Sequence, residues 1–82
     1  MLQIAQIRAA RALLGWRQDD LARAAKVGIA TVRRIESSGL ALGYVSTLIR
    51  IQAAFEQAGI QFIEEDQIGG IGVRIAKTKR KR

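Results

Sequence analysis

One stretch of this 82-residue chain combines small, apolar and basic side chains: Ile29, Ala30, Thr31, Arg33 and Arg34. A helix that carries small and basic residues fits the major groove of B-DNA. The chain has no His and no Cys, so it lacks the usual general base and the usual zinc ligands. The adjacent acids Glu64, Glu65 and Asp66 could hold a divalent cation, but neighbouring loop carboxylates are far more often solvated. We expect a binding protein that is not an enzyme and that takes no cofactor or metal.

Basic residues lie on both sides of an acidic centre. Residues 1–55 carry eight Lys/Arg and three Asp/Glu, residues 56–73 carry four acids and no base, and residues 74–82 carry six bases and no acid. Basic zones favour a polyanion such as nucleic acid, and the alternative is a solvated surface with a solubilising tail. We expect the tail, residues 77–82, to be disordered and either to follow DNA or to stay in solvent.

The length of the chain predicts one domain with a marginal core. Because there are no cysteines for disulfides, oligomerisation is the remaining source of extra buried surface. No apolar run approaches the roughly 20 residues of a membrane span, and the first residues lack the pattern of a signal peptide. We expect a soluble, cytoplasmic, nucleoid-associated protein.

Apolar spacing and glycines predict a mostly α fold of four helices followed by a β-hairpin. Residues 3–14, 18–25, 29–37 and 46–58 have helical periodicity and end at or near glycines. After Gly59, residues 60–64 and 71–76 are short, partly alternating and rich in β-formers. We assign residues 1–58 to a helical domain and residues 59–76 to a hairpin.

The second and third helices are joined by only three residues, Lys26, Val27 and Gly28. Two short helices with so short a turn must cross steeply, which requires apolar residues where they meet. Six positions satisfy this requirement: Leu21, Ala22, Ala25, Val27, Val32 and Ile35. Residues 18–37 therefore form a predicted helix-turn-helix, in which the helix over residues 29–37 leaves one face free.

Two segments, LGWRQDDLA at residues 14–22 and TVRRIESSG at residues 31–39, resemble the lambda-repressor-like helix-turn-helix family, also called the Cro/repressor or XRE type. The likeness covers about residues 4–58. It implies a four-helix domain that binds double-stranded DNA, with residues 29–37 as the recognition helix. It also implies a sequence-specific regulator of transcription.

The resemblance implies roles for single residues. Gln18 matches the glutamine that reaches the DNA backbone and sometimes a base, and Arg34 matches a position that contacts a base or a phosphate. Arg11 and Glu36 match an internal ion pair, in which Arg11 is not a DNA ligand. Base reading falls to four positions, Ile29, Ala30, Thr31 and Arg33.

Three positions depart from the family pattern. Arg17 stands where Ser or Thr often caps the helix, so a cap is lost and a phosphate contact is gained. Lys26 replaces a glycine in the turn and must adopt a left-handed conformation, which costs about 1 kcal/mol. Gly28 opens the recognition helix in place of Ser or Thr, and glycine is an acceptable cap.

The roles of four further side chains have alternatives. Ile29 and Ala30 either contact thymine methyl groups or only fill the helix, and Ile29 could also pack on a partner protein. Trp16 either packs in the core or stacks on a base, and core packing is favoured because stacking belongs to single-strand binders. Tyr44 either donates to a phosphate or packs.

A lone hairpin is not stable in water, so residues 59–76 must pack on the helices, pair with a second copy, or both. The alternating apolar residues predict a dimerisation element: Ile60, Phe62, Ile63, Ile71, Val73 and Ile75. We expect a homodimer on a palindromic operator that acts as a repressor by blocking polymerase, or else recruits polymerase. The alternative function is an antitoxin-like DNA-binding protein that also neutralises a partner toxin. RNA is a weaker alternative, because exposed aromatic residues are few.

Overall fold

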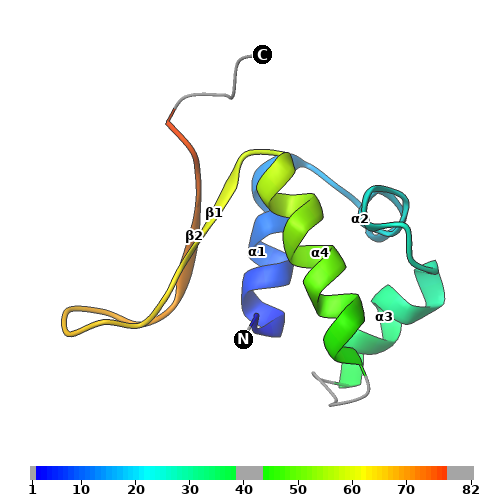
Figure 1. Ribbon diagram of the computed structural model, residues 1–82, viewed down its shortest axis with the longest axis horizontal. Coiled ribbons are helices and arrows are strands. Elements are labelled where there is room, and N and C mark those ends of the chain that lie inside the picture. Colours follow the sequence, from blue (N-terminus) through cyan, green and yellow to red (C-terminus); the bar gives the residue numbers. More distant parts are fainter. Residues whose placement is uncertain (1, 39–43, 78–82) are drawn as a thin grey trace.

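The computed structural model describes residues 2–38 and 44–77. It contains four helices and two strands (Figure 1): α1 (Ile4–Leu14), α2 (Gln18–Ala25), α3 (Ile29–Ser38), α4 (Val45–Gln57), β1 (Ile60–Ile63) and β2 (Gly72–Ile75). The predicted fold class, a mostly helical domain followed by a C-terminal hairpin, is confirmed. None of the described helices is long and apolar enough to cross a membrane. The prediction for the tail falls, beyond Lys77, outside the described residues.

The helix ends follow from local backbone chemistry. Gly15 ends α1 with a positive φ of 69°, and Lys26 ends α2 with a φ of 60°, the left-handed conformation that the sequence predicts there. The predicted loss of a side-chain cap at Arg17 is compensated in an unforeseen way. The Asp20 carboxylate accepts the backbone N–H of Arg17 at 2.8 Å and so satisfies one free donor at the start of α2.

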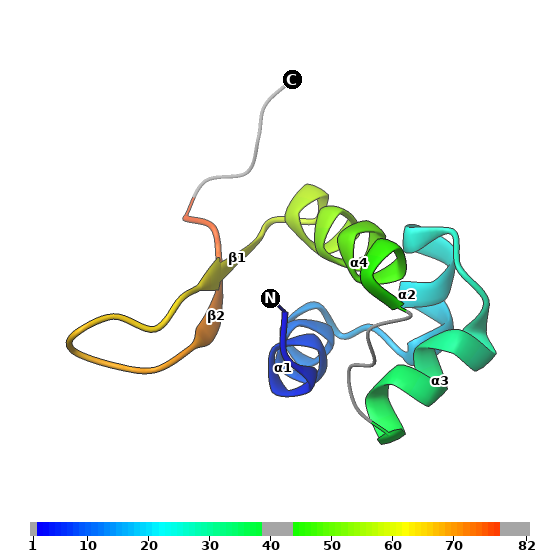
Figure 2. The same cartoon turned by 60° about the horizontal axis from the view of Figure 1, so that its bottom comes forward.

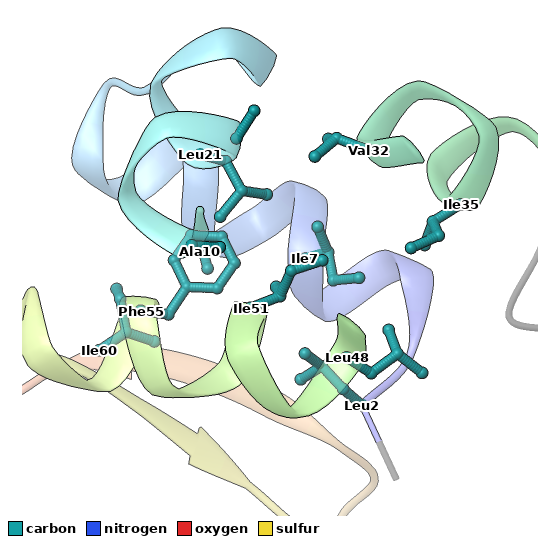
Figure 3. Packing of buried hydrophobic residues seen from close by; sticks show 12 residues of the cluster. Leu2, Ile7, Ala10, Leu21, Val32, Ile35, Leu48, Ile51, Phe55 and Ile60 are labelled. Carbon is teal, nitrogen blue, oxygen red and sulfur yellow. The ribbon is translucent and has the colours of Figure 1, made fainter. Parts of the chain in front are cut away.

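The core lies where the helices converge on the hairpin (Figure 3). Its largest fully buried side chains come from all four helices and from β1: Ile7, Leu21, Val32, Ile35, Ile51, Phe55 and Ile60. Trp16 stacks on Phe55 at a centroid distance of 5.6 Å, and Phe62 meets Phe55 edge to face at 6.0 Å. Trp16 therefore occupies the core-packing position that the sequence favoured.

The hairpin packs on the helices of its own chain. The strands pair antiparallel, with Ile60 opposite Ile75 and Ile63 opposite Gly72. Opposite residues share a face, and the face that contains Ile60, Phe62 and Val73 lies on the core. Ile60, Phe62 and Val73 were predicted to contact a second copy, but they pack on the core of their own chain. Packing within one molecule therefore explains part of the apolar alternation.

A buried glutamine fastens the hairpin to α1. Gln6 is 6% exposed, and its Nε2 donates to the carbonyl oxygens of Gly72 at 3.1 Å and Ile63 at 3.5 Å. Its Oε1 accepts the backbone N–H of Gln3 at 3.0 Å. Both ends of the amide are therefore satisfied, as burial requires. Beyond the Ile63–Gly72 pair, the loop of the hairpin extends away from the helices in both views (Figures 1 and 2).

Candidate nucleic-acid interface

Helix α3 presents a stripe of short and basic side chains to solvent. Val32, Ile35 and Glu36 face inward and are buried. The exposed positions lie on the opposite side at helical spacing: Ala30, Arg33, Arg34 and Ser37. The hydroxyls of Ser37 and Ser38 donate back to the Arg34 carbonyl, at 3.4 and 2.7 Å. The stripe is therefore small near the start of the helix and positively charged in its middle, which suits entry into a major groove.

The first turn of α3 is less open than the sequence suggested. Ile29 is half-buried and packs against the core, so only part of its side chain is available to a ligand. Thr31 is also half-buried, whereas Ala30 is exposed. The Gly28 carbonyl accepts the N–H groups of Thr31 and Val32, at 3.1 and 3.2 Å, and so begins the helix.

Glu36 joins α1, α2 and α3 from the inner side of α3. It is 3% exposed and forms a bidentate ion pair with Arg11, with both nitrogen–oxygen distances at 2.8 Å. This is the pair that the resemblance implies. Arg11 also donates to the Trp16 carbonyl at 3.2 Å. A planar guanidinium on a buried carboxylate fixes direction as well as distance, so α3 is held at a set angle to α1.

The same carboxylate positions Gln18 at the start of α2. The Nε2 of Gln18 donates to Glu36 Oε1 at 3.2 Å. A primary amide carries two N–H groups, so one remains for a phosphate oxygen while the other stays on Glu36. Arg17 precedes it with an exposed side chain, whose Nε lies 3.6 Å from Asp19. The start of α2 thus offers a hydrogen-bonded amide and an exposed guanidinium.

Arg34 and Tyr44 link α3 to the beginning of α4. Arg34 Nη1 donates to the Tyr44 hydroxyl at 3.2 Å, and this hydrogen bond raises the pKa of Arg34 above its ordinary value. The hydroxyl accepts from Arg34, so its own proton remains available to another acceptor. Tyr44 is half-buried and packs on the core, so its two predicted roles are compatible.

The loop of the hairpin is held by Asp66. Its Oδ1 accepts the backbone N–H groups of Gly69 at 2.9 Å and Ile68 at 2.8 Å, and these bonds, the Gly69 bond most, lower the pKa of the carboxyl. A lowered pKa means that the stabilisation is present above the ordinary Asp range and is lost as pH falls through the lowered value. Asp66 is therefore a turn former. Across residues 2–38 and 44–77, no group of three or more His, Cys, Asp or Glu is arranged to hold a metal ion.

Two structural residues escaped the sequence analysis. Gln6 stands four residues after Leu2 and four before Ala10, and all three are buried. This helical spacing between two apolar residues was the sequence signal that Gln6 is buried. Arg8 donates from Nη2 to the Glu36 backbone carbonyl at 2.6 Å, near the C-terminal end of α3, where a positive charge is favourable. It lies on the exposed side of α1, where no sequence pattern distinguishes it.

A short helix α2, a three-residue turn and an exposed basic stripe on α3 define a helix-turn-helix DNA-binding protein. The family model described as Helix-turn-helix matches residues 7–43, which include most of α1 and the whole of α2, the turn and α3. This match over residues 7–43 supports the lambda-repressor-like helix-turn-helix family of DNA-binding regulators, which the motifs at residues 14–22 and 31–39 resemble. No curated protein and no solved structure matches the chain.

Proposed function

We propose that the protein is a sequence-specific regulator of transcription that binds a palindromic operator as a homodimer. The observation that carries this proposal is the exposed stripe of α3, with Ala30, Arg33 and Arg34 on a helix whose other side is locked to α1 and α2. A recognition helix must be both exposed and rigid, since base contacts depend on alignment.

In this proposal, base reading and phosphate binding fall to different elements. Arg33 and Thr31 hydrogen-bond base edges, and Ala30 with the free part of Ile29 contacts thymine methyls. Arg17, Gln18 and the Tyr44 hydroxyl bind phosphates, and the Gly28 backbone lies at the helix start, where N–H groups favour anions. Arg34, held by Tyr44, contacts a base or a phosphate.

A dimer follows from the limited reach of one module. A single helix-turn-helix contacts about half the area of a strong specific site, and dimers of this motif bind half-sites about one helical turn apart. The hairpin provides apolar surface for the second copy. Ile71 and Ile75, at 45% and 51% exposure, supply most of it, Ile63 adds a half-buried side chain on the other face of the ribbon, and Ile60 is buried in the monomer. A bound dimer represses by excluding polymerase from the operator.

Two arginine substitutions test the division of roles. Arg33→Ala is expected to lose roughly 1–3 kcal/mol of preference for the specific site over random DNA, while Arg17→Ala weakens both equally. Arg50→Ala, which removes the same charge from α4, serves as the control. A gel-shift series with equal losses on specific and random DNA for Arg33→Ala would remove its base-reading role.

An antitoxin-like activity is the second candidate. The same exposed isoleucines of the hairpin would suit a toxin as partner, because exposed apolar side chains favour protein contacts. Co-purification of the tagged chain from its native cell would reveal a stoichiometric partner. Recovery of the chain alone would leave the homodimeric regulator as the function.

A further inference from the structure

The hairpin carries an apolar residue and a charge of definite sign at each end. We call residues 60–77 the hairpin arm. Its tip has Ile68, which is 96% exposed, and its base has the half-exposed Ile75. The turn at Asp66 fixes the backbone around Ile68 through two hydrogen bonds, so this isoleucine is displayed by an ordered loop. An isoleucine presented in this way has no packing partner among residues 2–38 and 44–77.

The charges of the arm separate along its length. Glu64 and Glu65 lie next to the tip and are exposed. Arg74 and Lys77 lie at the base and are also exposed, and Arg74 is held by Gln61 Oε1 at 2.8 Å. Glu56, at the end of α4, is an acid near the base, where Arg74 and Lys77 outnumber it.

We propose that two copies pack their hairpin arms antiparallel across a two-fold axis, so that the acidic tip of each arm lies on the basic base of the other. The inference rests on the proposed homodimer and specifies its geometry. With the axis near the Ile63–Gly72 pair, the tip isoleucine Ile68 of one copy falls beside Ile75 of its partner. The two exposed isoleucines thereby cover each other, and each contact occurs twice, as a two-fold axis requires.

The parallel alternative fails on charge. A parallel arrangement would place Glu64 and Glu65 against the same residues of the second copy. Like charges across an interface make the free energy of binding less favourable by several kcal/mol. The apolar residues alone do not distinguish the two arrangements, because an isoleucine lies at both ends. The separation of charge along the arm therefore selects the direction of pairing.

Charge reversal in the full chain tests this geometry. The wild type should sediment as a dimer at micromolar concentration. The variants Glu64→Lys/Glu65→Lys and Arg74→Glu/Lys77→Glu should each dimerise at least about 10-fold more weakly, because both ends then repel. An equimolar mixture of the two should recover dimers to within about 3-fold, since each substituted position then faces residues of opposite charge on the other copy. Glu56→Lys changes net charge outside the arm and should not weaken dimerisation.

Cross-linking tests the direction of pairing directly, and the absence of native cysteines makes it clean. Copies that carry Glu65→Cys are mixed with copies that carry Lys77→Cys and treated with a short thiol cross-linker. Mixed dimers should be the main product. Predominant Glu65→Cys homodimers would overturn the antiparallel arrangement, as would dimers indifferent to charge reversal. A monomeric wild type would instead reject the dimer in the proposed function, and this inference with it.

Discussion

Glu36 and Gln6 are the two buried polar residues among the described parts of the chain, and they fasten its two halves in different ways. Glu36 is charged and ties three helices together through Arg11 and Gln18. Gln6 is neutral and ties a single helix to the two strands of the hairpin. Removing the partner of a buried charge lowers the free energy of unfolding far more than removing the partner of a buried amide does.

This contrast divides the molecule into a stiff DNA-binding part and a hairpin held by weaker bonds. The angle between α1, α2 and α3 depends on an ion pair with fixed geometry, which suits a surface that must match bases. The hairpin depends on two amide donations and on the packing of Ile60, Phe62 and Val73. Substitutions at Glu36 and at Gln6 should therefore each affect one half.

The largest effect is expected at Glu36. Glu36→Ala leaves the Arg11 guanidinium largely buried without its carboxylate, and we expect the free energy of unfolding to fall by about 3–5 kcal/mol. Urea unfolding measures this change. Arg8→Ala is the control, since its side chain is 58% exposed and its Nε lies 3.9 Å from the Glu36 carboxylate, and so loose a pair with an exposed arginine contributes about 1 kcal/mol or less. Equal losses for the two variants would contradict a special role for the Arg11 pair.

A smaller and local effect is expected at Gln6. Gln6→Leu leaves the Ile63 and Gly72 carbonyls without their donor, at a cost of about 1–3 kcal/mol. Hydrogen exchange should accelerate in β1 and β2 while α3 keeps its protection. Gln52→Leu, whose amide bonds only the exposed Glu56, should change neither region. Faster exchange in α3 after Gln6→Leu would show that the two halves are not separable.

The smallest effects are expected at the two left-handed helix ends. Lys26→Gly should raise the free energy of unfolding by up to about 1 kcal/mol, because glycine adopts a φ of 60° without strain. Gly15→Ala should lower it by about the same amount, since a Cβ there meets no atom within 4 Å and only the φ of 69° opposes it. Thermal unfolding compares them, and shifts of equal sign would contradict the account.

The DNA-binding half could be predicted from sequence because its constraints are local. Apolar spacing and a three-residue turn determine how α2 and α3 cross, and Arg11 with Glu36 lie within a motif of known spacing. The role of Gln6 could not be predicted, since it depends on contacts with Ile63 and Gly72, which are separated from it by 57 and 66 positions in the sequence. The hairpin was foreseen as an element, but its inner face was assigned to a partner because alternation alone does not say which surface covers it.

Selection of bound sequences from a random pool of double-stranded DNA tests the central claim most directly. If α3 reads bases within a two-fold dimer, wild-type protein should enrich a palindrome whose half-sites lie about one helical turn apart. Arg33→Ala should lose preference at one symmetric pair of positions. Enrichment of no sequence over the starting pool would contradict base reading by α3, and enrichment of a single, unrepeated half-site would contradict the dimer.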